Sequence, residues 1–224
     1  MSQSRKSLST GALVAIAIAL GAVVGAAGIY WKASPSGNAP ATESLLAAGG
    51  AACKADLETL ATLKPLARGE VAAMAVREEP TALPELAFVS EEGEALTLAD
   101  FAGQALLVNL WATWCAPCRA EMPALAELQA ELGGDDFKVL AINIDTGDVA
   151  KPKAFLDEIG VSNLGLYRDA SMGVFNTLKK EGLAFGLPVT LMIDKDGCML
   201  GAMNGPAEWA STDAKALAGA LKGL

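Results

Sequence analysis

The sequence contains no histidine among its 224 residues, and this absence excludes several kinds of catalytic and metal site. Ser-His-Asp and Cys-His catalytic groups, haem attachment through a CxxCH motif, and copper or zinc sites with histidine ligands all require that residue. Basic residues are also few, since 17 lysines and arginines accompany 26 acidic residues, for a net charge of −9. This charge disfavours nucleic acids and anionic lipid surfaces as partners, so we expect no nucleic-acid binding.

Charged residues are absent from the N-terminal run GALVAIAIALGAVVGAAGIY, Gly11 to Tyr30. A helix of twenty uncharged, mostly apolar residues can cross a hydrocarbon layer of roughly 30 Å. Arg5 and Lys6 precede the run, which predicts that the N-terminus stays in the cytoplasm and that the rest of the chain is exported. A cleaved signal peptide ending near 25–27 is the alternative, and it implies export too. Either interpretation places the bulk of the chain where disulfides can form.

Composition divides the chain into five predicted segments. They are a cytoplasmic tail (1–10), a transmembrane anchor (11–31), a flexible linker (32–52), a helical extension (53–82) and a main domain (83–224). The linker is rich in Ala, Gly, Ser and Pro. In the extension, Leu57, Leu60 and Leu63 follow a helical spacing that Pro65 ends. This helix either packs against the main domain or forms part of a stalk.

The main domain alternates between strand and helix patterns. Apolar runs at 105–112 and 137–145 predict buried strands, and helices are expected at about 117–132, 148–160, 171–180 and from Pro206 onward. Short strands are expected on both sides of Glu92-Gly93 and near 163–169, and a hairpin turns at Asp196-Gly197. The pattern indicates an α/β fold with a mixed sheet flanked by helices.

Two of the four cysteines, Cys115 and Cys118, stand two residues apart directly after the apolar run at 105–112. They could hold a metal, form a static cross-link, or exchange electrons with other proteins. A Cys₄ zinc site would need the remaining two cysteines, which form no second CxxC pair, so no metal is expected. Cys115 would begin a helix, where unpaired N–H groups and the helix dipole stabilise a thiolate. Cys115 is therefore the predicted nucleophile and Cys118 the resolving cysteine.

These residues resemble the active site of the thioredoxin superfamily. Trp114-Cys115-Ala116-Pro117-Cys118 matches its WCxxC motif, Pro123 matches its helix-kinking proline, and Leu187-Pro188-Val189-Thr190 matches its cis-proline segment. A segment at about 146–165 corresponds to an inserted helix and strand. With the anchor, the pattern is similar to the membrane-anchored TlpA/ResA/CcmG-like branch, and a TlpA-like protein fits best. The resemblance covers about 83–224 and implies that Trp114, Leu187 and Pro188 contact substrate.

The chain departs from thioredoxin itself at two positions near the motif. Asn109 replaces a buried acid six residues before the first cysteine, and Leu187 precedes the cis-proline where a Thr or β-branched residue is common. The anchored reductases carry a glutamate three residues after the second cysteine, and Glu121 matches it. The resemblance therefore implies that Glu121 moves the Cys118 proton, with a pKa raised by desolvation. A solvated helix residue is the alternative.

Cys53 and Cys198 are the other two cysteines, and pairing them is the simplest solution in an exported chain with an even count. Such a disulfide would fasten the extension to the domain. Two buried free thiols, or a second redox pair, are the alternatives.

The resemblance implies a periplasmic thiol:disulfide oxidoreductase held in the inner membrane by one span, without a cofactor. Its expected partners are proteins with reducible cysteine pairs in copper-site or cytochrome c biogenesis, and a membrane electron donor that relays thiols. A dithiol oxidase and a non-enzymatic CxxC metal carrier are the alternatives.

Overall fold

Strand β4 (Ala105–Trp111) forms the centre of the folded unit, and all seven of its residues are buried. The structure is a computed structural model that describes Cys53 and residues 57–224. The apolar run predicted a strand covered on both faces, and alternate residues of β4 do enter two separate cores. Leu107 and Trp111 face one core, whereas Leu106, Val108 and Leu110 face the other.

The sheet has eight strands in the order β1-β8-β7-β4-β5-β6-β2-β3. The β4 strand pairs in parallel with β5 and antiparallel with β7, so the sheet is mixed, as the sequence predicted. The other strands are β1 (Ala75–Ala82), β2 (Ala87–Val89), β3 (Ala95–Thr97), β5 (Phe137–Asn143), β6 (Tyr167–Arg168), β7 (Val189–Ile193) and β8 (Cys198–Asn204).

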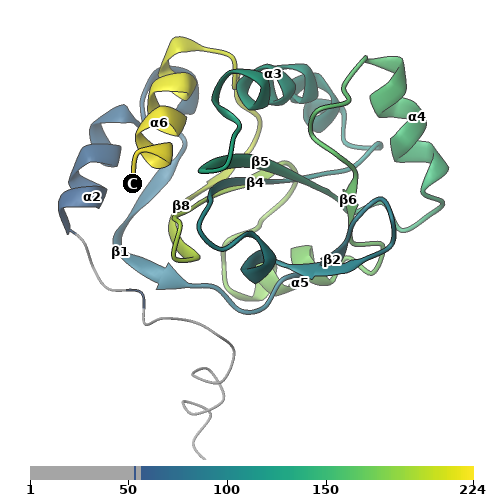
Figure 1. The fold of residues 1–224 in the computed structure, drawn as a ribbon, viewed down its shortest axis with the longest axis horizontal. Coiled ribbons are helices and arrows are strands. Elements are labelled where there is room, and N and C mark those ends of the chain that lie inside the picture. Colours follow the sequence, from purple (N-terminus) through teal and green to yellow (C-terminus); the bar gives the residue numbers. More distant parts are fainter. Residues whose placement is uncertain (1–52, 54–56) are drawn as a thin grey trace, which may run out of the picture. The chain divides into compact units, whose positions relative to one another are not determined.

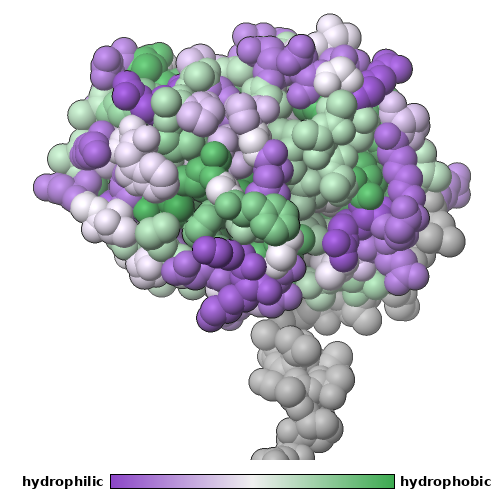
Figure 2. Space-filling model, turned by 180° about the vertical axis from the view of Figure 1, so that it is seen from behind, coloured by the Kyte–Doolittle hydropathy of each residue, from purple (hydrophilic) through white to green (hydrophobic). Residues whose placement is uncertain are grey.

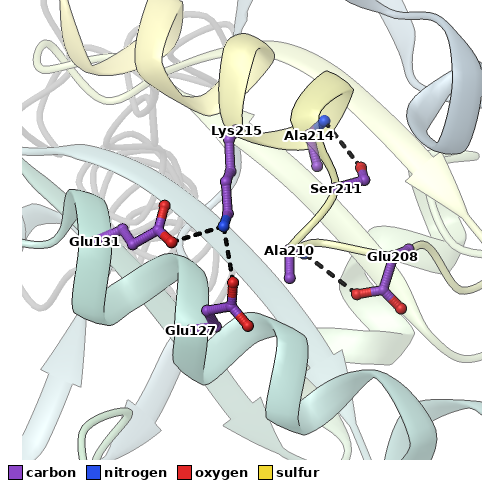
Figure 3. A network of polar contacts seen from close by, with 7 residues as sticks. All are labelled: Glu127, Glu131, Glu208, Ala210, Ser211, Ala214 and Lys215. Atoms are coloured by element: carbon purple, nitrogen blue, oxygen red, sulfur yellow. Dashed lines mark hydrogen bonds and ion pairs between the residues drawn. The ribbon is translucent and has the colours of Figure 1, made fainter.

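Helices cover both faces of the sheet (Figure 1). Helices α3 (Ala116–Leu132) and α6 (Thr212–Lys222) lie on one face, and α5 (Gly173–Lys180) lies on the other. Lys215 of α6 binds the carboxylates of Glu127 and Glu131 on α3, at 2.7 and 2.6 Å (Figure 3). The remaining helical elements are α2 (Leu57–Leu63), α4 (Ala150–Glu158), and the 3₁₀ turns η1 (Lys64–Leu66), η2 (Gly69–Val71) and η3 (Leu98–Phe101).

The extension belongs to the folded unit. Leu60 and Leu63 of α2 are buried in the core shared with α3 and α6, so α2 is not part of a stalk. The sequence interpretation missed β1, which adds a strand to the sheet by pairing antiparallel with β8. Its residues alternate poorly in polarity, and all of them are exposed or half-buried.

The final helix begins later than the sequence predicted. We expected it near Pro206, but α6 starts at Thr212, with Ser211 as its N-cap. Residues 206–211 instead form a loop that reaches α3, and the Ser211 Oγ accepts the Ala214 N–H at 3.2 Å. Proline at the first turn of a helix is common, which is why Pro206 was misleading.

The predicted tail, anchor and linker (1–52) lie outside the described residues. Within the part of the chain that the structure describes, no helix has the length and apolar character that a membrane span needs.

The surface seen from behind has apolar residues near its middle and hydrophilic residues toward its rim (Figure 2).

Candidate active site

The two close cysteines lie where β4 ends and α3 begins. Cys115 is the N-cap of α3, and its Sγ accepts the backbone N–H of Cys118 at 3.2 Å. The pair is oxidised to a disulfide in the structure, with Cα atoms 5.3 Å apart. Cys115 keeps 6% of its surface exposed, whereas Cys118 is completely buried. A partner protein can therefore reach the first sulfur more easily than the second.

The residues predicted to contact substrate are placed around the same end of the sheet. Trp114 is 60% exposed, beside Cys115 in the chain. The Leu187–Pro188 peptide bond is cis, and it directly precedes β7. Leu110, near the C-terminal end of β4, pairs with Val189 at the start of β7. Pro188 therefore lies near the end of β4 that leads into the CxxC motif. Leu187 is half-buried and packs against both cores.

Glu121 is buried one turn beyond Cys118 on α3, with 3% of its surface exposed. Burial raises its pKa from 4.5 to about 7, because the carboxylate loses water. Three hydrogen bonds oppose the rise, from the side chains of Asn109 and Trp209 and from the backbone of Ala207. The alternative of a solvated Glu121 is wrong. A carboxyl with this pKa can both take and give a proton near neutral pH.

Sequence reasoning singled out Asn109 but missed its contact with the Glu121 carboxyl, and it missed Ala207 and Trp209 altogether. Asn109 donates to Oε1 at 2.8 Å, while the Trp209 indole N–H and the Ala207 N–H both donate to Oε2 at 3.2 Å. Asn109 also donates to Thr190 Oγ1 at 3.1 Å. Alternation along β4 could have placed Asn109 on the α3 side of the sheet, because Leu107 and Trp111 face that side. No local signal connects Glu121 with Trp209, 88 residues later.

The other two cysteines are joined in a second disulfide. Cys53 and Cys198 are 145 residues apart in the chain, with Cα atoms at 5.7 Å. Cys198 begins β8, directly after the hairpin turn, and is buried. The disulfide fixes Cys53 to the sheet. The described residues include no cluster of three or more Cys, Asp or Glu side chains that could hold a metal ion.

Comparison with known proteins places the chain in a family. The sequence pattern of the Redoxin family matches residues 78–219, more than half of the chain. The chain is similar to the thioredoxin-like protein YneN of Bacillus subtilis, with 38% identity over 82 residues that cover 36% of this chain and 48% of that protein. It is also similar to the thiol-disulfide oxidoreductase ResA of Bacillus thuringiensis, with 31% identity over 114 residues, or 51% of this chain and 62% of that protein. These matches span about half to two thirds of the relatives' lengths.

A solved structure shows the same fold. A thiol:disulfide interchange protein of the thioredoxin family from Chlorobium tepidum aligns with a TM-score of 0.53. The alignment has 23% sequence identity and covers 64% of this chain and 97% of that one. The thioredoxin-like arrangement of a mixed sheet flanked by helices is thereby confirmed.

Proposed function

Since the chain belongs to the Redoxin family, on its TlpA/ResA/CcmG-like branch, we propose that it is a thiol:disulfide oxidoreductase that exchanges electrons through Cys115 and Cys118. One observation carries the proposal. The Cys115 Sγ accepts a hydrogen bond at the start of α3, where 6% of the residue's surface is exposed, and the completely buried Cys118 follows one turn later. After reduction, the same N–H group and the helix dipole favour the Cys115 thiolate.

The exchange proceeds in two displacement steps. The Cys115 thiolate attacks one sulfur of a substrate disulfide, which forms a mixed disulfide and releases one substrate thiolate. Cys118 loses its proton and attacks the Cys115 sulfur, so the substrate leaves as a dithiol and the Cys115–Cys118 disulfide forms. Two electrons pass from the protein to the substrate. Glu121 is the proposed base for the Cys118 proton, and Trp114, Leu187 and Pro188 are the proposed substrate contacts.

Two cysteine variants test this function by their different outcomes. Cys115→Ser removes the nucleophile and is expected to abolish reduction of insulin disulfides. Cys118→Ser leaves the nucleophile without its resolving partner and is expected to accumulate mixed disulfides. The matched control is Cys53→Ser/Cys198→Ser, which removes the other disulfide and should keep the exchange activity. Full activity of Cys115→Ser would overturn the proposal.

The proposed direction is reduction, with clients in copper-site or cytochrome c biogenesis and a membrane thiol-relay protein as electron donor. The relatives named for thiol:disulfide exchange support the reaction type. A reduction potential near or below about −220 mV for the Cys115–Cys118 pair would support a reductase. A potential near about −120 mV would instead indicate a dithiol oxidase.

The proposed location is the periplasmic side of the inner membrane, with residues 11–31 as an uncleaved single span. The uncharged run Gly11 to Tyr30 and the preceding Arg5 and Lys6 support this topology. The mass of the protein recovered from membranes tests it. An intact N-terminus in the membrane fraction is expected, and loss of residues up to about 27 would show a cleaved signal peptide instead.

A further inference from the structure

The two oxygens of the Glu121 carboxyl have partners of different kinds. Oε2 accepts from the backbone N–H of Ala207 and from the indole N–H of Trp209. Both groups are donors only, and neither can accept a hydrogen bond. Oε1 contacts the Asn109 amide, which carries a donor on one side and an acceptor on the other. The partner of Oε1 can therefore change its role, whereas the partners of Oε2 cannot.

This asymmetry determines where a proton can reside on Glu121. A carboxylic acid donates one hydrogen bond, and a buried O–H group without an acceptor is costly. A proton on Oε2 would face two N–H groups and find no acceptor there. The proton is therefore held on Oε1 and directed at Asn109, where the amide nitrogen now points.

The Asn109 amide has an acceptor that is not in use. Its Oδ1 is buried and has no hydrogen-bond partner among the described residues. Rotation of the amide by half a turn exchanges Oδ1 with Nδ2, so Oδ1 would face both Glu121 Oε1 and Thr190 Oγ1. The Thr190 hydroxyl can donate as well as accept, so both contacts of the amide survive the rotation, while the N–H groups of Nδ2 move to the buried position where Oδ1 has no partner among the described residues.

We propose that Asn109 is a positioning residue for thiol exchange, whose side-chain amide turns over when Glu121 gains or loses its proton. The amide donates to the carboxylate through Nδ2 and accepts from the carboxylic acid through Oδ1. Glu121 thus keeps a hydrogen bond to Asn109 in both states without a second charge nearby. The inference depends on the proposed role of Glu121 as the base for Cys118.

Among the groups around Glu121, the Asn109 amide is the one that can respond when the carboxyl gains or loses its proton. Within the described residues, β4 presents Asn109, β7 presents Thr190, and the loop before α6 presents Ala207 and Trp209. None of these groups is charged. On α3, the guanidinium of Arg119 lies over the Phe155 ring, and no charged side chain is among the causes of the Glu121 pKa shift. Cys115 and Cys118 do not titrate while they form their disulfide. Oxidised protein therefore isolates the carboxyl from the thiols.

The test follows the Asn109 side chain by NMR in the oxidised full chain, on both sides of the Glu121 pKa of about 7. At high pH we expect nuclear Overhauser contacts from the Asn109 amide protons to Thr190. On acidification these contacts should disappear with the same midpoint as the ¹³C shift of the Glu121 carboxyl. Glu121→Gln should remove them at every pH, because the amide nitrogen of the introduced side chain can only donate to Asn109 and the turned form persists.

A second buried asparagine serves as the control within the same molecule. Asn143 donates to Asp145 Oδ2 at 2.9 Å, and its Oδ1 accepts the Asp145 N–H at 3.1 Å. Both sides of that amide are occupied, so its contacts should not depend on the protonation of Glu121.

Two outcomes would overturn the proposal. If the contacts from the Asn109 amide protons to Thr190 persist while Glu121 titrates, the amide does not turn over. If Glu121 stays ionised over the whole pH range, the amide has no change of protonation to respond to. Neither readout requires catalysis. Failure of this inference is therefore distinguishable from failure of the oxidoreductase function, which the Cys115→Ser assay tests.

Discussion

At the scale of single residues, the buried Glu121 makes the free energy of unfolding depend on pH. Its pKa is about 7 in the folded protein, against 4.5 in the reference state. The folded protein therefore holds an extra proton between these values, and the stability contributed by Glu121 is full below about pH 4.5 and lost as the pH rises toward 7. Above pH 7 the ionised carboxyl costs about 3 kcal/mol at the rate of about 1.4 kcal/mol per pKa unit.

Glu121→Gln should remove this pH-dependent cost. Relative to the original chain, we expect the variant to gain up to about 3 kcal/mol of stability above pH 7 and to lose that advantage near pH 4.5. Urea unfolding of both oxidised proteins across this range measures the difference, and other titrating groups cancel. Glu158→Gln, an exposed change on α4, is the matched control. A difference between the proteins that is constant with pH would contradict the prediction.

The Trp209 indole provides a second residue-scale prediction. Its N–H stabilises the Glu121 carboxylate, so Trp209→Phe should raise the Glu121 pKa further, by about one unit for a hydrogen bond of about 1.5 kcal/mol to a charged group. The ¹³C shift of the Glu121 carboxyl against pH gives the value.

Trp111→Phe is the control for that measurement. Trp111 is also buried, but its Nε1 has no hydrogen-bond partner in the described region. Replacing Trp111 by Phe should leave the pKa of Glu121 unchanged. If both substitutions moved the midpoint equally, repacking of the core rather than the lost indole donor would be the cause.

At the scale of elements, the sequence predicted a helix or strand correctly where the segment itself contains the apolar pattern and the residues that mark its start and end. Strand β4 is uniformly apolar apart from Asn109, and α3 runs from Ala116 to Leu132 with Cys115 as its N-cap, close to the predicted limits. Strand β1 and the start of α6 were missed because both depend on distant partners. The β1 strand needs the edge of β8, and the loop at 206–211 is held by Glu121.

The start of α6 can be tested through its cap. Ser211 Oγ accepts the Ala214 N–H, so Ser211→Ala should lower the free energy of unfolding by about 1 kcal/mol, a usual value for loss of an N-cap. Chemical unfolding at constant pH measures this loss. The exposed Ser162→Ala provides a matched change outside a cap and should have little effect. Equal stability of the two variants would show that Ser211 does not cap α6.

At the scale of the whole molecule, the candidate site combines one local motif with several distant supports. The cysteine pair and Glu121 lie within seven residues on one helix end, so their spacing was readable from the sequence. Asn109 of β4 and Trp209 of the loop before α6 bind the same carboxyl, and Thr190 of β7 accepts a hydrogen bond from Asn109. Their roles depend on strand order and register, which no short pattern contains.

The Cys53–Cys198 disulfide also acts on the whole molecule, because its two ends are 145 residues apart. In the chain-entropy model, closing so long a loop destabilises the unfolded state by up to about 5 kcal/mol. The double variant Cys53→Ser/Cys198→Ser should therefore unfold at a clearly lower guanidinium concentration while Cys115 and Cys118 remain oxidised. Because the disulfide fastens the extension to β8, hydrogen exchange should accelerate more in β1 than in β4. An unchanged midpoint with unchanged exchange in β1 would mean that the packing of Leu60 and Leu63 holds the extension without the covalent link.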